Sequence, residues 1–549
     1  MTLLYQNVKI KVMYILNVIP LIKIPRPNSQ LLSYFSSEKT EIGSLVEILI
    51  RNRKLKAIVV EQKNIEKEKL KIKKQLSFSI RPINKIVSKE PILTKQQIEL
   101  LFWISDYYFI SLGQTARIFL SKNKEREKNF KKVKNNLILK LENKNIVFSP
   151  FKDLKSITIE NEESELYKSW ARRPYYNVKT IAIQLAKIHK AKLILKSKIP
   201  SIQTLYKYKP IIEKQAKNKK TKLIDMRQEM KQGNYSIISK ELEERIKKYK
   251  KAILYITRRG TSTFVLCREC GYTANCKNCD APMVFHESLR KTNKSLLCHH
   301  CSKQDIAPVL CPKCRSIKIK YFGSGTEKVE SELKKIFPNV LRMDGDISEK
   351  PEQQEKIIKE FKKTNSILIG TQMILNKDIK ADLTGIISID TLLNLPDYHN
   401  SEKIFQIINK LKQMSNKEFV LQTYSPENNT IQNAIANNIK TFYNQEIKTR
   451  KLFSYPPFSQ IIKLSFEHKN PIIAKDQVKI LLEKLKQQKK NLNLNLEIIG
   501  PIPGFISKVR NQYKWNILIK SKEKIEKRNK LLIIVPSNWE IQVDPETIL

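Results

Sequence analysis

Residues 321–372 read YFGSGTEKVESELKKIFPNVLRMDGDISEKPEQQEKIIKEFKKTNSILIGTQ, a stretch in which helical and extended patterns alternate. Apolar spacing predicts helices over Val329–Ile336 and Gln353–Phe361, and short apolar runs predict strands over Val340–Met343 and Ile367–Ile369. Strands that alternate with helices form parallel sheets, and functional loops lie at the carboxyl ends of such strands. The stretch therefore predicts an α/β domain.

All eight cysteines precede this stretch and form four Cys-x-x-Cys pairs: Cys267/Cys270, Cys276/Cys279, Cys298/Cys301 and Cys311/Cys314. Two-residue spacing aims both thiolates at one ion, and two pairs complete the tetrahedral ligand set of zinc. A disulfide framework is instead typical of small secreted domains. We predict two structural zinc sites. Spacing alone leaves open whether adjacent pairs combine or the outer pairs enclose the inner ones.

The charge of the chain favours a polyanionic partner. Lys and Arg number 103 against 53 Asp and Glu, which gives a formal net charge of +50. Part of this excess fits the Lys, Ile and Asn bias of an AT-rich genome, and evenly spread lysines would only solvate the surface. A nucleic-acid-binding face requires that the cations cluster.

Glycine is scarce, at 12 of 549 residues, and no glycine is followed by lysine. A phosphate-binding P-loop requires that dipeptide, because backbone N–H groups wrap the phosphates while the lysine neutralises them. The sequence therefore lacks a Walker A loop.

No apolar run reaches the roughly 20 residues of a membrane helix, and Val12–Ile22, interrupted by Asn17 and Pro20, is predicted to be a buried strand in a cytoplasmic protein.

Both ends of the chain show mixed patterns. Ser44–Ile50 and Ala57–Val60 are strand-like and precede a helical stretch, Leu100–Phe109. The last 90 or so residues predict a compact α+β domain. Its expected elements are strand Ile461–Phe466, helix Ile472–Gln488, and strands Leu496–Ile499, Trp515–Ile519 and Leu531–Val535.

Short motifs occur along the chain in a fixed order: Trp103–Tyr108, Leu112-Gly113, Asp225–Glu229, Arg258–Gly260, Gly325–Glu327, Gly370–Met373, Leu393–Asp397, Tyr455–Phe458, Gly500-Pro501 and Val543–Pro545. This ordered set resembles the PriA family, the primosomal protein N′ that restarts stalled bacterial replication forks. The resemblance covers most of the chain.

The patterns and the resemblance together predict a multidomain α/β and α+β protein. Its expected parts are a β-rich N-terminal domain that resembles a 3′-DNA-binding domain and ends in a helix (1–120), a shortened, degenerate first RecA-like helicase lobe (121–250), a second RecA-like lobe (251–450) with a zinc module inserted at 262–320, and an α+β C-terminal domain (451–549).

The resemblance also implies a nested arrangement of two zinc ions. Cys267, Cys270, Cys311 and Cys314 would hold one ion, and Cys276, Cys279, Cys298 and Cys301 the other. In the family this module supports fork binding and contacts with primosome partners.

The sequence departs from the family, whose members are ATP-driven helicases, at the motifs that handle ATP. The basic run Lys122–Lys140 stands where the family has its P-loop, Asn161–Ser164 replaces Asp-Glu-Glu-His, and Lys196–Ser201 replaces the Ser-Ala-Thr-Pro motif. Lys410–Lys417 replaces the arginine block, with Met414 and Lys417 in the arginine positions. Phosphoryl transfer depends on positioning and charge neutralisation, so we expect no ATPase activity and no catalytic residues. Gly370-Thr371-Gln372 is then expected to be a strand-end turn maintained by packing.

Contacts with DNA are expected at both ends of the chain. The family's pocket for a nascent 3′ end corresponds to the surroundings of Tyr34, Arg51 and Arg81, although Arg51 stands where a glycine usually shapes the pocket. In the C-terminal domain, Arg510, Tyr513 and Lys514 combine cations with an aromatic ring, which suits phosphates and unpaired bases.

These observations predict a replication restart protein of the primosome that has lost its motor. It would bind branched or single-stranded fork DNA, carry two zinc ions, and recruit primosome proteins and the replicative helicase loader, with single-stranded DNA-binding protein as a further partner. We expect it in the cytoplasm, associated with the nucleoid and without membrane contact. The alternatives are a residual ATP-dependent DNA helicase and a general zinc-dependent nucleic-acid-binding protein.

Overall fold

The computed structural model describes residues 14–548 apart from 27, 65–80, 122–137, 142–144, 170–173, 211–219, 258–264, 278–282, 288–293, 299–302, 322–325, 346–349 and 510–511. The chain divides into two compact units. The first unit comprises residues 1–200, 484–496 and 521–546, and the second comprises 201–483, 497–520 and 547–549. Within the described residues, no helix is both long and apolar enough to cross a bilayer.

The first unit begins with a six-stranded sheet of order β5-β2-β1-β4-β3-β6. Its strands are β1 (Tyr14–Pro20), β2 (Leu32–Ser36), β3 (Leu45–Ile50), β4 (Arg53–Asn64), β5 (Arg81–Pro82) and β6 (Lys85–Ser88). Alternate residues of these strands, among them Leu16, Val18, Val46, Ile48 and Val59, form one buried cluster. The expected β-rich N-terminal domain is confirmed.

Helices α2 (Lys95–Tyr108) and α3 (Leu112–Ser121) follow this sheet. Thr94 and Gln97 form a capping box at the start of α2, since each side chain bonds the other residue's backbone N–H. Helix α15 (Ile525–Leu532) and strand β26 (Glu540–Val543) pack against α2. The wholly buried Arg528 of α15 donates hydrogen bonds of 2.9 Å to the carbonyls of Asp106 and Tyr107.

The first unit also holds a three-stranded parallel sheet of order β11-β8-β7. Its strands are β7 (Ile138–Lys140), β8 (Ser156–Glu160) and β11 (Lys192–Lys196), and helix α4 (Val178–Ile188) packs on it. The short strands β9 (Lys168–Ser169) and β10 (Tyr176–Asn177) pair separately.

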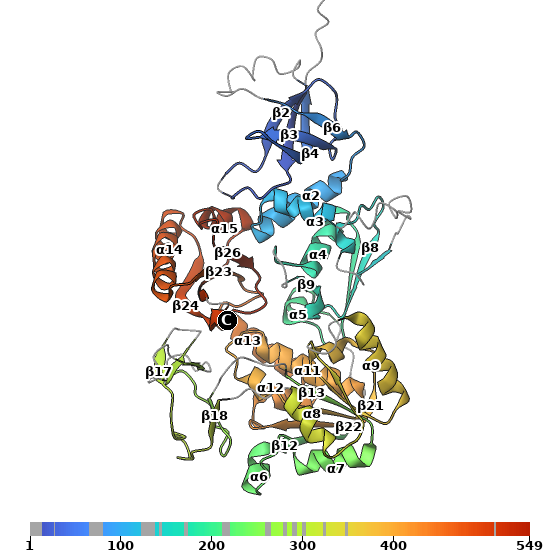
Figure 1. Cartoon of the computed structure of the whole chain (residues 1–549), viewed down its shortest axis with the longest axis vertical. Helices are drawn as coiled ribbons and strands as arrows, with labels where there is room; N and C mark the ends of the chain where they lie inside the picture. The colour runs from blue at the N-terminus through green and yellow to red at the C-terminus, as the bar shows by residue number, and fades with distance from the viewer. Residues whose placement is uncertain are drawn as a thin grey trace, which may run out of the picture. The chain divides into compact units, whose positions relative to one another are not determined.

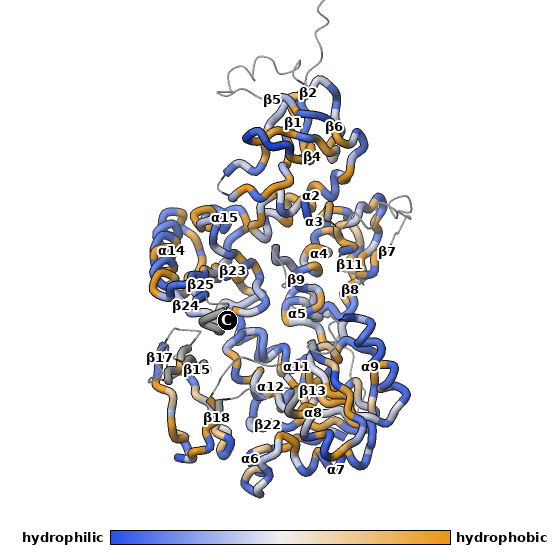
Figure 2. Tube along the Cα trace, viewed as in Figure 1, coloured by the Kyte–Doolittle hydropathy of each residue, from blue (hydrophilic) through white to orange (hydrophobic). Residues whose placement is uncertain are grey.

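A six-stranded parallel sheet of order β12-β22-β21-β13-β20-β19 is the centre of the second unit (Figure 1). Its strands are β12 (Lys220–Asp225), β13 (Ala252–Ile256), β19 (Val340–Met343), β20 (Ile367–Gly370), β21 (Ala381–Ser388) and β22 (Ser415–Thr423). Apolar residues are concentrated on its strands (Figure 2), and Leu254, Ile369, Leu383 and Val420 belong to one buried cluster. The parallel sheet predicted from residues 321–372 is present.

Helices of the second unit surround this sheet: α5 (Ile202–Tyr208), α6 (Met226–Lys231), α7 (Lys240–Tyr249), α8 (Thr326–Lys334), α9 (Pro351–Lys363), α10 (Asp390–Leu393), α11 (Asn400–Met414), α12 (Asn429–Ile435) and α13 (Ile439–Leu452). The sequence placed 220–249 with the first lobe, whereas in the structure β12 pairs with β22. Residues 220–225 therefore belong to the six-stranded sheet. Exposed and more buried residues alternate along β12, which suits its place as an edge strand.

The described residues of the cysteine-rich segment form five short strands: β14 (Val265–Cys267), β15 (Val284–Glu287), β16 (Lys294–Leu297), β17 (Gln304–Ile306) and β18 (Ile319–Tyr321). Near the C-terminus the chain forms strand β23 (Gln460–His468), helix α14 (Pro471–Asn491), and strands β24 (Leu496–Val509) and β25 (Gln512–Ser521). In the sheet, β25 lies between β24 and β23. The predicted strand Leu531–Val535 is wrong, because Leu531 and Leu532 are the buried last residues of α15.

Candidate metal centre and nucleic-acid contacts

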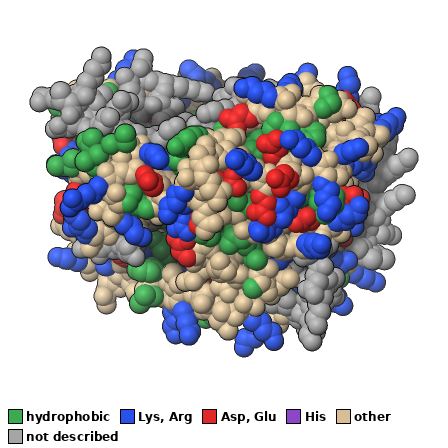
Figure 3. All heavy atoms as spheres, turned by 90° about the horizontal axis from the view of Figure 1, so that it is seen from below, with side chains coloured by type: hydrophobic (Ala, Val, Ile, Leu, Met, Phe, Trp, Pro, Cys, Tyr) green, Lys and Arg blue, Asp and Glu red, His purple; other side chains and the backbone are tan. Residues whose placement is uncertain are grey.

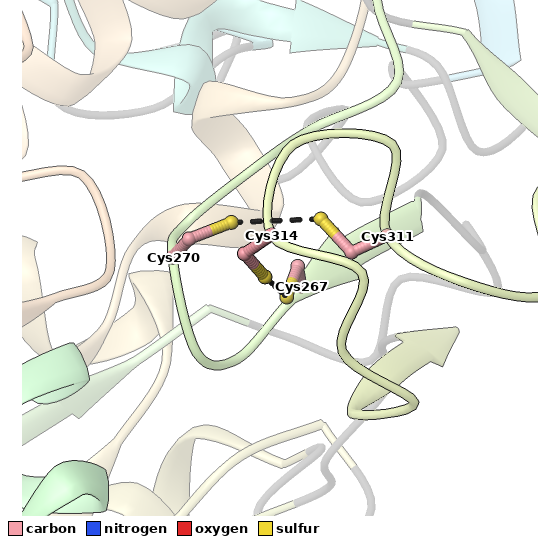
Figure 4. Close-up of side chains that lie close together, drawn as sticks. All are labelled: Cys267, Cys270, Cys311 and Cys314. Atoms are coloured by element: carbon pink, nitrogen blue, oxygen red, sulfur yellow. Dashed lines mark hydrogen bonds between the residues drawn. The ribbon is translucent and has the colours of Figure 1, made fainter.

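Four cysteines from the outer two pairs converge in the second unit (Figure 4). The Sγ atoms of Cys267, Cys270, Cys311 and Cys314 all lie within 4.8 Å of one another. The Sγ atoms of Cys267 and Cys314 are 3.6 Å apart, and those of Cys270 and Cys311 are 3.5 Å apart. Ligands on a tetrahedral zinc at about 2.3 Å would be separated by about 3.8 Å. Of the two schemes that spacing left open, the structure brings the outer pairs together.

Each of these cysteine pairs forms a tight turn that aims both thiols the same way. The N–H of Gly271 donates to the carbonyl of Cys267 at 2.9 Å, and that of Arg315 donates to the carbonyl of Cys311 at 2.8 Å. Gly271 and Arg315 both have left-handed backbones, with φ of 74° and 58°. Glycine adopts this conformation freely, whereas an arginine is strained in it.

The first of these turns lies against the end of the central sheet. A Cβ atom on Gly271 would be 2.6 Å from the carbonyl oxygen of Tyr424, which follows β22. Strand β14 pairs with β18, so that Cys267 lies opposite Ile319. Close packing and strand pairing together hold both turns in place.

The chemistry of the four thiols fits a divalent cation. Burial is the main cause that raises the pKa of the Cys270 thiol to about 12, and burial also raises the pKa of Cys267. A bound divalent cation reverses this effect, because coordination stabilises the thiolate directly. The residues therefore suit a metal ion that bonds sulfur.

The inner cysteine pairs are described in part. Cys276 and Cys298 are buried in one cluster with Val265, Met283 and Leu296. Cys279 and Cys301 lie outside the described residues.

The structure brings together two of the three residues expected at the N-terminal DNA pocket. Tyr34 on β2 lies opposite Arg81 on β5. The Tyr34 ring is only 6% exposed, its hydroxyl donates to the carbonyl of Leu49 at 2.9 Å, and burial raises its pKa. Arg51 is exposed in the turn between β3 and β4. Tyr34 is thus a packed residue, while both arginines present exposed cations.

Of the residues expected at the C-terminal site, Lys514 pairs with an acidic residue. Tyr513 is half-buried on β25. The Nζ atom of Lys514 lies 3.2 Å from a carboxylate oxygen of Glu467, which offsets its charge. Arg510 lies outside the described residues.

Asn161–Ser164, expected to stand where the family has its metal-binding motif, follow β8 and contact neighbouring residues. The buried carboxylate of Glu162 lies 2.7 Å from Nζ of Lys179 on α4. The hydroxyl of Ser197 donates to Glu163 at 2.6 Å, and Ser164 accepts the N–H of Leu166. Asn161 has a left-handed backbone with φ of 47°. These side chains form local structural contacts.

Residues of Lys410–Lys417, the segment expected to replace the family's arginine block, also make structural contacts. Met414 is 8% exposed at the end of α11, and Lys417 pairs with Asp382 at 2.7 Å. Lys412 donates to the carbonyls of Ala434 and Ile435 at the end of α12, and burial lowers its pKa to about 8. Carbonyl groups at the end of α12 therefore hold the Lys412 ammonium group.

Gly370 and Thr371 fit the expected packing role. A Cβ atom on Gly370 would collide with the side chain of Ile374, and Thr371 is 2% exposed.

On the face shown in Figure 3, lysine and arginine side chains are scattered among acidic and apolar ones. Charge on that face is distributed as on a solvated surface.

Known proteins match this chain along most of its length. Residues 21–121 match the family model of the 3′DNA-binding domain (3'BD), and residues 451–546 match that of the primosomal protein N C-terminal domain. The replication restart protein PriA of Bacillus subtilis is 33% identical over 404 residues, which are 69% of this chain and 49% of that protein. PriA of Synechocystis is 30% identical over 434 residues, or 73% of this chain and 52% of that protein.

PriA of Borreliella burgdorferi is 33% identical over 430 residues, which cover 73% of this chain and 63% of the relative. The chain thus spans about half the length of the first two relatives. Family-specific domains match near both ends of the chain, and these three relatives align with 69–73% of its residues. By these matches, the chain belongs to the PriA family.

Proposed function

We propose that this protein is a replication restart factor that binds branched fork DNA and recruits restart partners without unwinding DNA itself. The observation that carries the proposal is the match of residues 21–121 to the family's 3′DNA-binding domain, which coincides with the N-terminal sheet and its helices. Exposed Arg51 and Arg81 on that sheet supply cations for phosphates. The protein would work in the cytoplasm at the nucleoid.

The absence of a motor is supported by the side chains at the former ATP motifs. Glu162 is neutralised by Lys179, Met414 is buried, and Lys417 is paired with Asp382. A lysine presents a point charge rather than the bidentate fork of arginine. Together with the missing Gly-Lys dipeptide, these side chains support a protein that does not hydrolyse ATP.

Zinc would have a structural role. Cys267, Cys270, Cys311 and Cys314 would hold one ion, and Cys276, Cys279, Cys298 and Cys301 a second ion in the nested scheme. The ions would cross-link a segment whose strands are too short to form a large core. Elemental analysis should find two zinc ions per chain. The variant Cys314→Ser should bind one zinc ion, and its Cys276 should stay protected from alkylation. A count of one zinc ion in the unaltered protein would contradict the two nested sites.

A binding assay tests the DNA function. Forked DNA and duplex DNA of equal length compete for the protein at about 150 mM salt, where non-specific phosphate contacts are weakened. We expect a clear preference for the fork and no DNA-stimulated release of phosphate from ATP. Equal affinity for both DNAs would contradict fork recognition, and DNA-stimulated hydrolysis that Gly370→Ala abolishes would establish the helicase alternative.

The proposed partners are primosome proteins, the replicative helicase loader and single-stranded DNA-binding protein. Co-sedimentation of each purified partner with the protein, with and without fork DNA, tests them separately.

A further inference from the structure

Exposed aromatic side chains lie on α5 and just after α13, two helices of the second unit that contact each other. Tyr206 and Tyr208 in the last turn of α5 are 46% and 43% exposed, and Phe453 after α13 is 38% exposed. The Tyr206 ring packs edge-on against Phe458, with 4.9 Å between ring centroids. Two distant parts of the sequence thus form one surface, which we call the aromatic surface: Tyr206, Tyr208, Phe453 and Phe458.

The aromatic surface is flanked by cations. Lys207 and Lys209 are exposed beside the tyrosines, and Nζ of Lys207 lies 5.2 Å from the centroid of the Tyr208 ring. On α13, Lys448 and Lys451 are exposed as well. Cations accompany the rings on both segments.

Carboxylates do not balance these lysines along the same segments. Helix α5 contains no acidic residue, and Glu446 is the only one between 439 and 459. The Glu446 carboxylate is buried and accepts a hydrogen bond of 2.9 Å from Nε of Arg450. The same arginine lies 2.7 Å from Glu402, so Glu446 belongs to a buried ion-pair cluster and does not pair with the exposed lysines.

We propose that the aromatic surface binds single-stranded nucleic acid, a site that rests on the proposed function and extends it. Exposed rings between lysines stack on unpaired bases while the ammonium groups neutralise phosphates. The edge-on contact with Phe458 orients the Tyr206 ring before binding, so little side-chain entropy is lost. Proteins seldom expose several aromatic rings together unless a ligand covers them. Exposed lysines on both segments, with no exposed carboxylate inside either segment, favour a polyanion over an ordinary protein partner.

Fluorescence anisotropy with single-stranded oligothymidylate and oligouridylate of about 16 nucleotides tests the site. The double variant Tyr206→Ala/Tyr208→Ala should weaken binding about tenfold or more, because two stacking contacts are lost. The double variant Tyr206→Phe/Tyr208→Phe should restore it, since phenylalanine stacks equally well. Tyr235→Ala is the matched control: this tyrosine is 61% exposed with Lys318 5.6 Å from its ring, but it lies on another loop.

A second variant measures the electrostatic part. Lys207→Gln/Lys209→Gln should reduce the salt dependence of single-strand binding by about two phosphate contacts. The oligonucleotide that the unaltered protein binds with the higher affinity, oligothymidylate or oligouridylate, identifies whether DNA or RNA is the ligand.

If the alanine variant binds both oligonucleotides as tightly as the unaltered protein, the aromatic surface is not the site. Fork preference would then survive and only this inference would fail. If the unaltered protein binds neither forks nor single strands, the proposed function fails with it. A variant that loses single-strand binding but keeps duplex binding supports the stacking site and excludes misfolding as the cause.

Discussion

The two parallel sheets of this protein are held together differently. The three-stranded sheet of the first unit depends on polar links at its strand ends, where Lys179 meets the buried Glu162 and Ser197 meets Glu163. The six-stranded sheet of the second unit has a large apolar core, and the pair of Lys417 with Asp382, near the first residues of the interior strands β22 and β21, is exposed. A small sheet buries little apolar area, so one buried ion pair contributes more to its stability.

The largest expected effect comes from breaking the buried pair of the small sheet. Lys179→Met should destabilise the first unit by about 3–5 kcal/mol, because the buried Glu162 carboxylate loses its cation. Hydrogen exchange of the β8 and β11 amides during urea unfolding measures the loss. Lys179→Arg keeps the charge and should behave nearly as the unaltered protein. Equal exchange in the Met variant would show that the small sheet does not depend on this pair.

A second prediction concerns a buried acid at the end of the large sheet. Asp390 accepts hydrogen bonds from Thr423 and Tyr424, yet its second carboxylate oxygen has no partner among the described residues. Burial, followed by the nearby charge of Asp225, raises its pKa to about 6.

A raised folded-state pKa means that protonation stabilises the fold. This contribution is fully present below the unfolded pKa of about 3.9 and is lost as the pH rises through about 6. The free energy of unfolding of the unaltered protein should therefore fall by about 2–3 kcal/mol between pH 4 and pH 6.5 because of Asp390, and Asp390→Asn should abolish this fall. Parallel pH curves for both proteins, measured by urea unfolding of the second unit, would contradict the prediction.

Alanine substitutions at two glycines test how much the contact between the cysteine segment and the large sheet contributes to stability. Gly271→Ala should cost about 1–2 kcal/mol for the left-handed backbone and more for the clash with the Tyr424 carbonyl. Gly233→Ala is the control, because Gly233 has φ of 83° but nothing within 4 Å of an added Cβ. Hydrogen exchange of β14 measures the difference, and equal effects of the two variants would show that the contact with Tyr424 is unimportant.

The smallest effect is expected at the exposed pair of the large sheet. Lys417→Met removes an ion pair with the same 2.7 Å separation as that of Lys179, but the Lys417 side chain is 60% exposed. Water and salt screen such a pair. We expect no measurable change in the stability of the second unit, and a loss comparable to that of Lys179→Met would erase the contrast between the sheets.

Much of the fold follows from local patterns. The alternation in residues 321–372 predicts the parallel sheet, and the strands and helix near the N-terminus appear where expected. Leu531–Val535 was predicted as a strand because an apolar run of five residues suits either element. Burial of Leu531 and Leu532 against the rest of the first unit favours the helix. Residues 220–225 fall inside the segment 121–250 expected for the first lobe, whereas β12 pairs with β22, because pairing partners distant in sequence leave no local signal.

The candidate sites divide along the same line. The Cys-x-x-Cys pairs are visible in the sequence because metal ligands need particular atoms at short spacing. The burial of Tyr34 and the pairing of Lys514 with Glu467 are not visible, since both depend on neighbouring strands. The aromatic surface was missed as well. The alternation of tyrosine and lysine at 206–209 was its signal, but its Phe458 partner comes from a distant segment.

The sequence by itself determined the chemistry available to this protein: thiols spaced for metal, an excess of cations, and no Gly-Lys dipeptide for a P-loop. Covalent spacing and composition are local properties, so they need no fold to be read. Only the tertiary structure decided which cysteine pairs meet, which lysines are neutralised and which rings remain exposed. Those outcomes depend on contacts between residues far apart in the chain, where packing and burial set the free energy of each group.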